Sequence, residues 1–140
     1  IEALYDAGKT KMIGISNVTA DQLTLLCARA AHKPMVVQNR CYAALGWDQD
    51  VRAICRTHGI IYQGFSLLTA NREIFPDPEV RAMAAKYGMG LAQLVFRFAM
   101  QIGMLPLTGT TDPQHMQEDL RSDQFTIAPD DLQRLEIIGM

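Results

Sequence analysis

Residues 11–39 read KMIGISNVTADQLTLLCARAAHKPMVVQN, and this stretch predicts a strand, a helix and a second strand. Its first six residues are a short β-rich run that ends before Asn17. Thr19 then begins a helix, because Gln22 completes a capping box in which each side chain satisfies a free backbone N–H of the other residue. Pro34 ends the helix by forcing the preceding residue away from helical angles, and residues 35–38 form the second strand. The stretch is therefore a β-α-β unit.

The same alternation continues to the end of the chain. The remaining expected elements are a helix over 48–58, a strand over 60–66, helices over 78–87 and 91–102, a strand over 104–107, and helices over 112–120 and 129–138. Strands that alternate with helices across short connections predict a parallel α/β sheet with right-handed crossovers. Four such strands make half of a (β/α)8 TIM barrel. An open, doubly wound four-stranded sheet is the competing fold, and periodicity alone does not separate the two.

The composition is that of a soluble globular protein of one domain or part of one. Of the 140 residues, 49% are hydrophobic and 20% are charged, and the net charge of -2 includes no basic stripe. A small-molecule partner is therefore favoured over nucleic acid or a membrane surface. No apolar stretch approaches the ~20 residues that a membrane-spanning helix needs. Three cysteines without metal-site spacing predict reduced thiols in a cytoplasm, and the start at Ile1 predicts a chain that begins mid-protein.

Polar and aromatic side chains follow each of the four predicted strands. The strand ends read Ser16-Asn17, Gln38-Asn39, residues 65–68 (FSLL) and residues 108–111 (TGTT). Ligands of parallel α/β folds bind at the carboxyl ends of the strands, so these groups are expected to meet at one rim. Taken singly, Ser16 and Asn17 are also typical of a helix cap, whereas an amide such as Gln38 on a buried strand needs hydrogen-bond partners.

Five segments resemble the aldo-keto reductases. Residues 8–17, with Gly8-Lys9 and Ile13-Gly14-Ile15-Ser16-Asn17, are similar to the Gly-Lys-x-x-x-Ile-Gly-[Val/Ile]-Ser-Asn segment of that family. The other similar segments, in the family's order, are residues 34–39, 59–68, 92–98 and 106–120. The match runs nearly end to end, so residues 1–140 resemble a partial aldo-keto reductase domain, the C-terminal, cofactor-binding half of the barrel.

The resemblance implies a nicotinamide cofactor. Ser16, Asn17 and Gln38 match residues that hydrogen-bond the nicotinamide carboxamide, and Phe65 matches a tyrosine that stacks on the ring. The residues that match contacts farther along the cofactor are Ser66, Leu68, Thr108, Gly109, Thr110, Thr111, His115, Glu118 and Asp119. Free N–H groups at the following helix N-terminus favour phosphate, which makes NADPH the first expectation. NADH stays open, because His115 stands where many members of the family have arginine.

The family's catalytic Asp, Tyr, Lys and His lie on its first four strands, which have no counterpart in this sequence. We therefore assign no catalytic residue and no metal ligand, and expect the chain alone to be inert. The complete protein is expected to reduce aldehydes or ketones to alcohols by hydride transfer, with a substrate that the sequence does not identify. The exposed edges of a half-barrel call for an N-terminal half or self-association. The alternatives are a non-catalytic nucleotide-binding half-barrel module and a regulatory subunit that binds cofactor without turnover.

Overall fold

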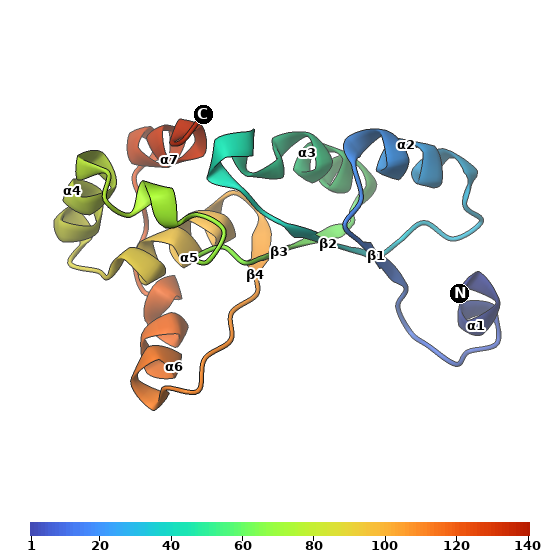
Figure 1. Ribbon diagram of the computed structural model, residues 1–140. Coiled ribbons are helices and arrows are strands. Elements are labelled where there is room, and N and C mark those ends of the chain that lie inside the picture. Colours follow the sequence, from blue (N-terminus) through green and yellow to red (C-terminus); the bar gives the residue numbers. More distant parts are fainter.

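The computed structural model describes residues 1–140 and confirms four parallel strands alternating with helices (Figure 1). The strands β1 (Gly14–Ser16), β2 (Val36–Arg40), β3 (Ile61–Phe65) and β4 (Met104–Pro106) pair in the order β1-β2-β3-β4. The helices are α1 (Glu2–Asp6), α2 (Ala20–Arg29), α3 (Gln49–His58), α4 (Pro78–Tyr87), α5 (Leu91–Gln101), α6 (Pro113–Leu120) and α7 (Pro129–Ile137). Short 3-10 helices cover η1 (Ala43–Asp48), η2 (Arg72–Ile74) and η3 (Arg121–Asp123). None of the helices has the length and apolarity that crossing a membrane requires.

Helix α2 begins as the sequence predicts and ends earlier. The Gln22 backbone N–H donates to Thr19 Oγ1 over 3.3 Å, and the Thr19 N–H donates to Gln22 Oε1 over 3.0 Å, which completes the capping box. The helix ends at Arg29, and Ala30 already has extended backbone angles. Pro34 therefore lies in the connection to β2 and does not itself stop the helix.

The first strand is shorter than predicted, because only Gly14–Ser16 reach the neighbouring strand. Gly14 lies so close to β2 that a Cβ atom there would be 2.7 Å from the Val36 carbonyl oxygen. No real Cβ tolerates that approach, so a glycine at this position permits the pairing of β1 with β2.

The two faces of the sheet differ in burial. Val37, Tyr62 and Met104 are buried on the face covered by helices, where α2 and α3 lie along one side in Figure 1. The alternate residues point the other way, to what we call the open face: Gly14, Ser16, Val36, Gln38, Arg40, Ile61, Gln63, Phe65 and Leu105. On this face Ile61 is 45% and Leu105 49% exposed. Such exposed apolar side chains are expected where the lumen of a barrel is only half enclosed.

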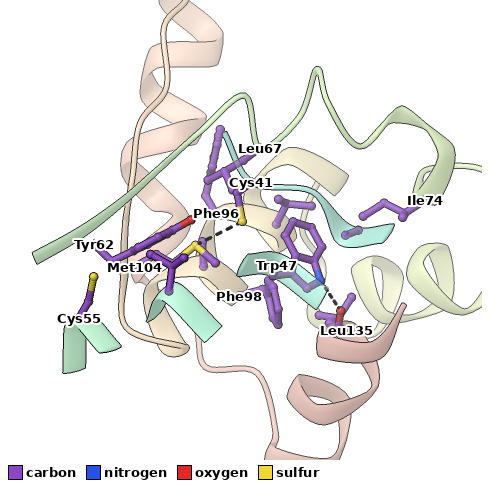
Figure 2. Packing of buried hydrophobic residues seen from close by; sticks show 14 of the residues in the cluster. Cys41, Trp47, Cys55, Tyr62, Leu67, Ile74, Phe96, Phe98, Met104 and Leu135 are labelled. Carbon is purple, nitrogen blue, oxygen red and sulfur yellow. Dashed lines mark hydrogen bonds between the residues drawn. The ribbon is translucent and has the colours of Figure 1, made fainter. Parts of the chain in front are cut away.

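The core packs the helices against the sheet and is shown in Figure 2. Trp47 is fully buried, its indole N–H donates to the Leu135 carbonyl oxygen over 2.8 Å, and its ring lies 4.9 Å from that of Phe98. The three cysteines are buried and free, and burial raises the pKa of Cys41 to about 12 and of Cys55 to about 11. These two side chains therefore remain protonated thiols at neutral pH.

Candidate cofactor-binding site

Ser16, Asn17 and Gln38 come together where β1 and β2 end. Ser16 pairs with Gln38 in the strand register, and its hydroxyl donates to the Gln38 carbonyl oxygen over 2.8 Å. The Asn17 N–H donates to the same carbonyl oxygen over 3.0 Å. Asn17 has a φ of 56°, in the left-handed region, and its exposed side chain makes no hydrogen bond within the chain. The ends of β1 and β2 are therefore joined by two hydrogen bonds to Gln38, and the Asn17 side-chain amide beside them is free to bind a ligand.

A second glutamine faces Gln38 across the open face. Gln63 is its register partner on β3, and Gln38 Nε2 donates to Gln63 Oε1 over 3.1 Å. Ser16, Gln38 and Gln63 line part of a pocket of about 250 Å³. Sequence reasoning did not single out Gln63. The signal that could have found it is the period of two in β3, which puts Gln63 on the same face as Phe65.

Phe65 lies half-buried at the end of β3, on the same face as Gln38. Its register partner is Arg40, the last residue of β2, whose guanidinium carbon lies 5.5 Å from the centre of the Phe65 ring. The predicted carboxamide contact, Gln38, and the predicted stacking residue, Phe65, are thus two register positions apart on adjacent strands. Arg40 adds a cation that sequence reasoning did not single out.

The ends of β3 and β4 form a second, smaller hollow. Ser66, Leu68, Thr108 and Gly109 line part of a pocket of about 180 Å³ between these two strand ends. Ser66 has a φ of 57°, so two of the four non-glycine residues with positive φ, Asn17 and Ser66, come directly after a strand on this rim. Backbone in such conformations clusters at functional sites, because the surrounding structure must hold it there.

The N-terminus of α6 differs from the expectation of free N–H groups. The Asp112 carboxylate accepts from the backbone N–H of Gln114 over 2.8 Å and of His115 over 3.4 Å. The Asp112 N–H in turn donates to Thr110 Oγ1 over 3.1 Å. An aspartate at the N-cap is a strong acceptor for these donors, so a carboxylate already holds the position expected for phosphate.

The other predicted residues of this region lie on α6 and in the loop between β4 and α6. The Thr108 hydroxyl donates to Asp119 Oδ2 over 2.8 Å, and Gln114 Nε2 donates to Glu118 Oε1 over 2.8 Å. Thr111 and His115 are exposed, and the His115 side chain makes no hydrogen bond. The predicted residues His115, Glu118 and Asp119 therefore share α6 with the N-cap Asp112, which the sequence did not single out. The region holds three carboxylates and one histidine.

Curated relatives of the chain include aldo-keto reductases and uncharacterised oxidoreductases. It is 27% identical over 142 residues to aldo-keto reductase family 1 member A1 of Xenopus tropicalis, covering 95% of this chain and 43% of the relative. It is 30% identical over 136 residues to an uncharacterised oxidoreductase of Schizosaccharomyces pombe, covering 96% of this chain and 47% of the relative. The chain therefore spans about half the length of the curated relatives it matches. No family model matches the chain.

Two aldo-keto reductases are among the solved structures that share this fold. An aldo-keto reductase from a Medee basin deep-sea metagenome library superimposes with a TM-score of 0.88 at 21% identity, over 99% of this chain and 52% of that one. An aldo/keto reductase of Brucella melitensis gives a TM-score of 0.82 at 23% identity, over 96% and 51% of the two chains. The chain is similar in sequence to aldo-keto reductases over about half of their length, and its fold matches about half of these solved barrels.

Proposed function

We propose that residues 1–140 are the nicotinamide dinucleotide-binding half of an aldo-keto reductase, and that the complete barrel reduces aldehydes or ketones to alcohols. The observation that carries this proposal is the meeting of Ser16, Asn17, Gln38 and Phe65 at the ends of three adjacent strands, with Gln38 and Phe65 on one face. A bound nicotinamide cofactor would supply the hydride. The chain would supply its binding and orientation.

The residues at this end fit a planar carboxamide on an aromatic ring. The free Asn17 side chain offers both a donor and an acceptor, and the Gln38 Oε1 atom remains available while its Nε2 is held by Gln63. Phe65 offers an apolar ring two register positions beyond Gln38 on the neighbouring strand, which suits stacking in an offset arrangement. Together these groups would determine which face of the nicotinamide ring is turned toward the substrate.

The hollow between β3 and β4 would take the cofactor's pyrophosphate. Ser66 and Thr108 contribute hydroxyl groups to it, and Gly109 leaves the backbone accessible, since a Cβ atom there would meet nothing within 4 Å. The cofactor would then extend from the β1–β2 end of the rim toward α6.

The type of cofactor depends on the charges around α6. The sequence puts NADPH first, but its 2′-phosphate would meet the carboxylates of Asp112, Glu118 and Asp119 with His115 as the only basic residue among the predicted contacts. Ribose hydroxyl groups, by contrast, donate to carboxylates, as in NAD-binding sites of other folds. We therefore propose that the chain binds NADH more tightly than NADPH.

The chain would act only within a closed barrel. Strands β1 and β4 each have one unpaired edge, and we assign no catalytic residue within residues 1–140. We propose that an N-terminal half with four further strands completes the barrel and supplies the proton-transfer residues. The alternative is that a second copy of the chain pairs with the free edges of β1 and β4. The buried free thiols suit a reducing compartment such as the cytoplasm.

The test is coenzyme binding to the assembled, folded protein. Titration with NADH and with NADPH, followed by nicotinamide fluorescence, should show saturable binding. Gln38→Ala and Phe65→Ala should each weaken it by about tenfold. Gln133→Ala, an exposed residue of α7, is the matched control and should leave it unchanged. If neither coenzyme binds to protein with native circular dichroism, the proposed function is wrong.

A further inference from the structure

Asn39, the residue after Gln38 on β2, points to the face covered by helices and is buried there. Its Oδ1 atom accepts from the Val18 backbone N–H over 3.0 Å, and its Nδ2 atom donates to the Val18 carbonyl oxygen over 2.7 Å. One side-chain amide thus binds both backbone polar groups of a single residue. Because Val18 directly follows Asn17, this contact acts on the backbone beside a proposed coenzyme contact.

The Asp48 carboxylate fixes the orientation of the Asn39 amide. Its Oδ2 atom accepts from Asn39 Nδ2 over 2.8 Å and from the Tyr62 hydroxyl over 2.7 Å. Burial raises the pKa of Tyr62, so this hydroxyl stays protonated and remains a donor. If the amide were flipped, Asn39 Oδ1 would face the oxygen atoms of Val18 and Asp48, and Nδ2 would face the Val18 N–H. Only the observed orientation pairs every donor with an acceptor.

The backbone that carries this carboxylate has an unfavourable conformation. Gly46, Trp47 and Asp48 have φ of 63°, 54° and 57°, which places three consecutive residues in the left-handed region. Residues with a Cβ atom adopt this region only where the surrounding structure holds them there. The Arg52 side chain contributes to that hold, since its Nε donates to the Trp47 carbonyl oxygen over 2.8 Å. The fold therefore maintains a costly conformation at the residue that orients Asn39.

Asn17 is held by hydrogen bonds on both sides of its Cα atom. Its own N–H donates to the Gln38 carbonyl oxygen over 3.0 Å, and the next N–H along the chain, that of Val18, donates to Asn39. Its φ of 56° is uncommon outside glycine, although asparagine tolerates such angles better than most residues. Two consecutive residues of β2 thus hold Asn17 in the conformation that leaves its side chain exposed.

We propose that Asn39 is a positioning residue for the coenzyme: it fixes Asn17 in the left-handed conformation that turns the Asn17 amide to the nicotinamide carboxamide. This inference rests on the proposed function, which makes Asn17 a carboxamide contact. Asn39 is buried and would not touch the coenzyme, and Asp48 acts one step farther away, by orienting Asn39. Loss of either side chain should therefore weaken the binding of the nicotinamide end alone.

Two ligands separate this role from a merely structural one. The assembled protein is titrated calorimetrically with NADH and with ADP-ribose, which has the pyrophosphate and both ribose groups but no nicotinamide. Asn39→Ala should weaken NADH binding about fivefold, the usual effect of one lost hydrogen bond, and leave ADP-ribose binding unchanged. In protein that already carries Asn17→Ala, the same substitution should have no further effect on NADH, because Asn39 acts through Asn17.

Asp48→Gly is the second variant, and it decides the matter if Asn39→Ala does not fold. Glycine adopts the φ of 57° without strain, so this change removes the carboxylate and keeps the backbone. It should weaken NADH about twofold, the lower end for a lost hydrogen bond, and only where Asn17 is present. Asp131→Asn, which alters another buried carboxylate with two side-chain donors, is the control and should change neither affinity.

The proposal is overturned by any of three results in folded protein. These are an unchanged NADH affinity in the Asn39 and Asp48 variants, an equal loss for NADH and ADP-ribose, and an effect that persists in full after Asn17→Ala. Failure of the wild-type protein to bind either NADH or NADPH would instead refute the proposed function.

Discussion

The hydroxyl group of Ser16 donates to the backbone carbonyl oxygen of Gln38 over 2.8 Å and so ties the end of β1 to the end of β2. The Asn17 N–H donates to the same oxygen atom, which gives one carbonyl two donors from the neighbouring strand end. The distance between the predicted carboxamide contacts Asn17 and Gln38 is thus set by the Ser16 side chain as well as by the backbone pairing of β1 with β2.

Ser16→Ala should weaken coenzyme binding without unfolding the protein. The substitution removes one hydrogen bond of about 1 kcal/mol, so a dissociation constant that depends on this spacing should rise roughly fivefold. Fluorescence titration with NADH measures the change. Thr24→Ala, which alters an exposed hydroxyl group on α2, should have no effect. An unchanged affinity in Ser16→Ala would show that the contact does not position the site.

Asp112→Ser should shift the coenzyme preference toward NADPH. Serine retains the N-cap acceptor and removes the negative charge beside the expected 2′-phosphate, so helix α6 should persist. We expect the ratio of NADPH affinity to NADH affinity to rise by about tenfold, with circular dichroism unchanged. The same ratio in variant and wild type would contradict the role given to Asp112.

His115→Ala should act in the opposite direction. The exposed imidazole is the only basic group among the predicted contacts of α6, so its loss should weaken NADPH more than NADH. Parallel titrations of the variant and the wild type with the two coenzymes check this. Equal loss for the two coenzymes would exclude His115 from the 2′ position.

Asn71→Ala should strongly destabilise the fold. The Asn71 side chain is fully buried, accepts from the Ala43 N–H over 2.6 Å, and donates to the carbonyl oxygens of Cys41 and Leu67. Its removal leaves these buried groups without partners, at a cost of about 3 kcal/mol in the free energy of unfolding. Urea denaturation measures the loss, and Gln133→Ala serves as the neutral comparison. A loss below ~1 kcal/mol would mean that water replaces the amide.

Asp131 should make stability fall in acid. Hydrogen bonds from Lys86, over 2.6 Å, and from Tyr87, over 2.6 Å, hold the pKa of the Asp131 carboxyl below its usual value. The carboxylate's contribution is therefore complete above the unfolded pKa of about 4 and is lost as the pH falls through the lowered folded value. The pKa of Lys86 is raised by the same contact, so on the alkaline side the pair weakens only above the ordinary range of lysine.

The measurement compares urea midpoints of wild type and Asp131→Asn at pH 7, 5 and 3. The variant should be less stable at pH 7, and the difference should shrink toward pH 3. A difference that stays constant with pH would show that the ionised carboxylate is not what stabilises this contact.

Local sequence determined the helices of this protein. The capping box of Thr19 and Gln22, the proline at the start of α4 and the glycine after α3 act within one helical turn, so they are readable without knowledge of the fold. The parallel alternation of strands with helices also followed from the sequence, because short β-α-β connections allow few arrangements, whereas the strand order β1-β2-β3-β4 did not, since the doubly wound sheet stayed open as an alternative. The residues that end each strand were therefore identifiable as one rim.

Only the tertiary structure decided which side chains meet on that rim. The pairing of Gln38 with Gln63 and of Arg40 with Phe65 depends on the register between β2 and β3, and a slip of one residue would turn each of these strands' side chains to the other face. The length of β1 likewise depends on how far Gly14 can approach Val36. Helix ends are set by neighbours in the chain, whereas strand register is set by contacts between distant segments, and those contacts form only in the folded sheet.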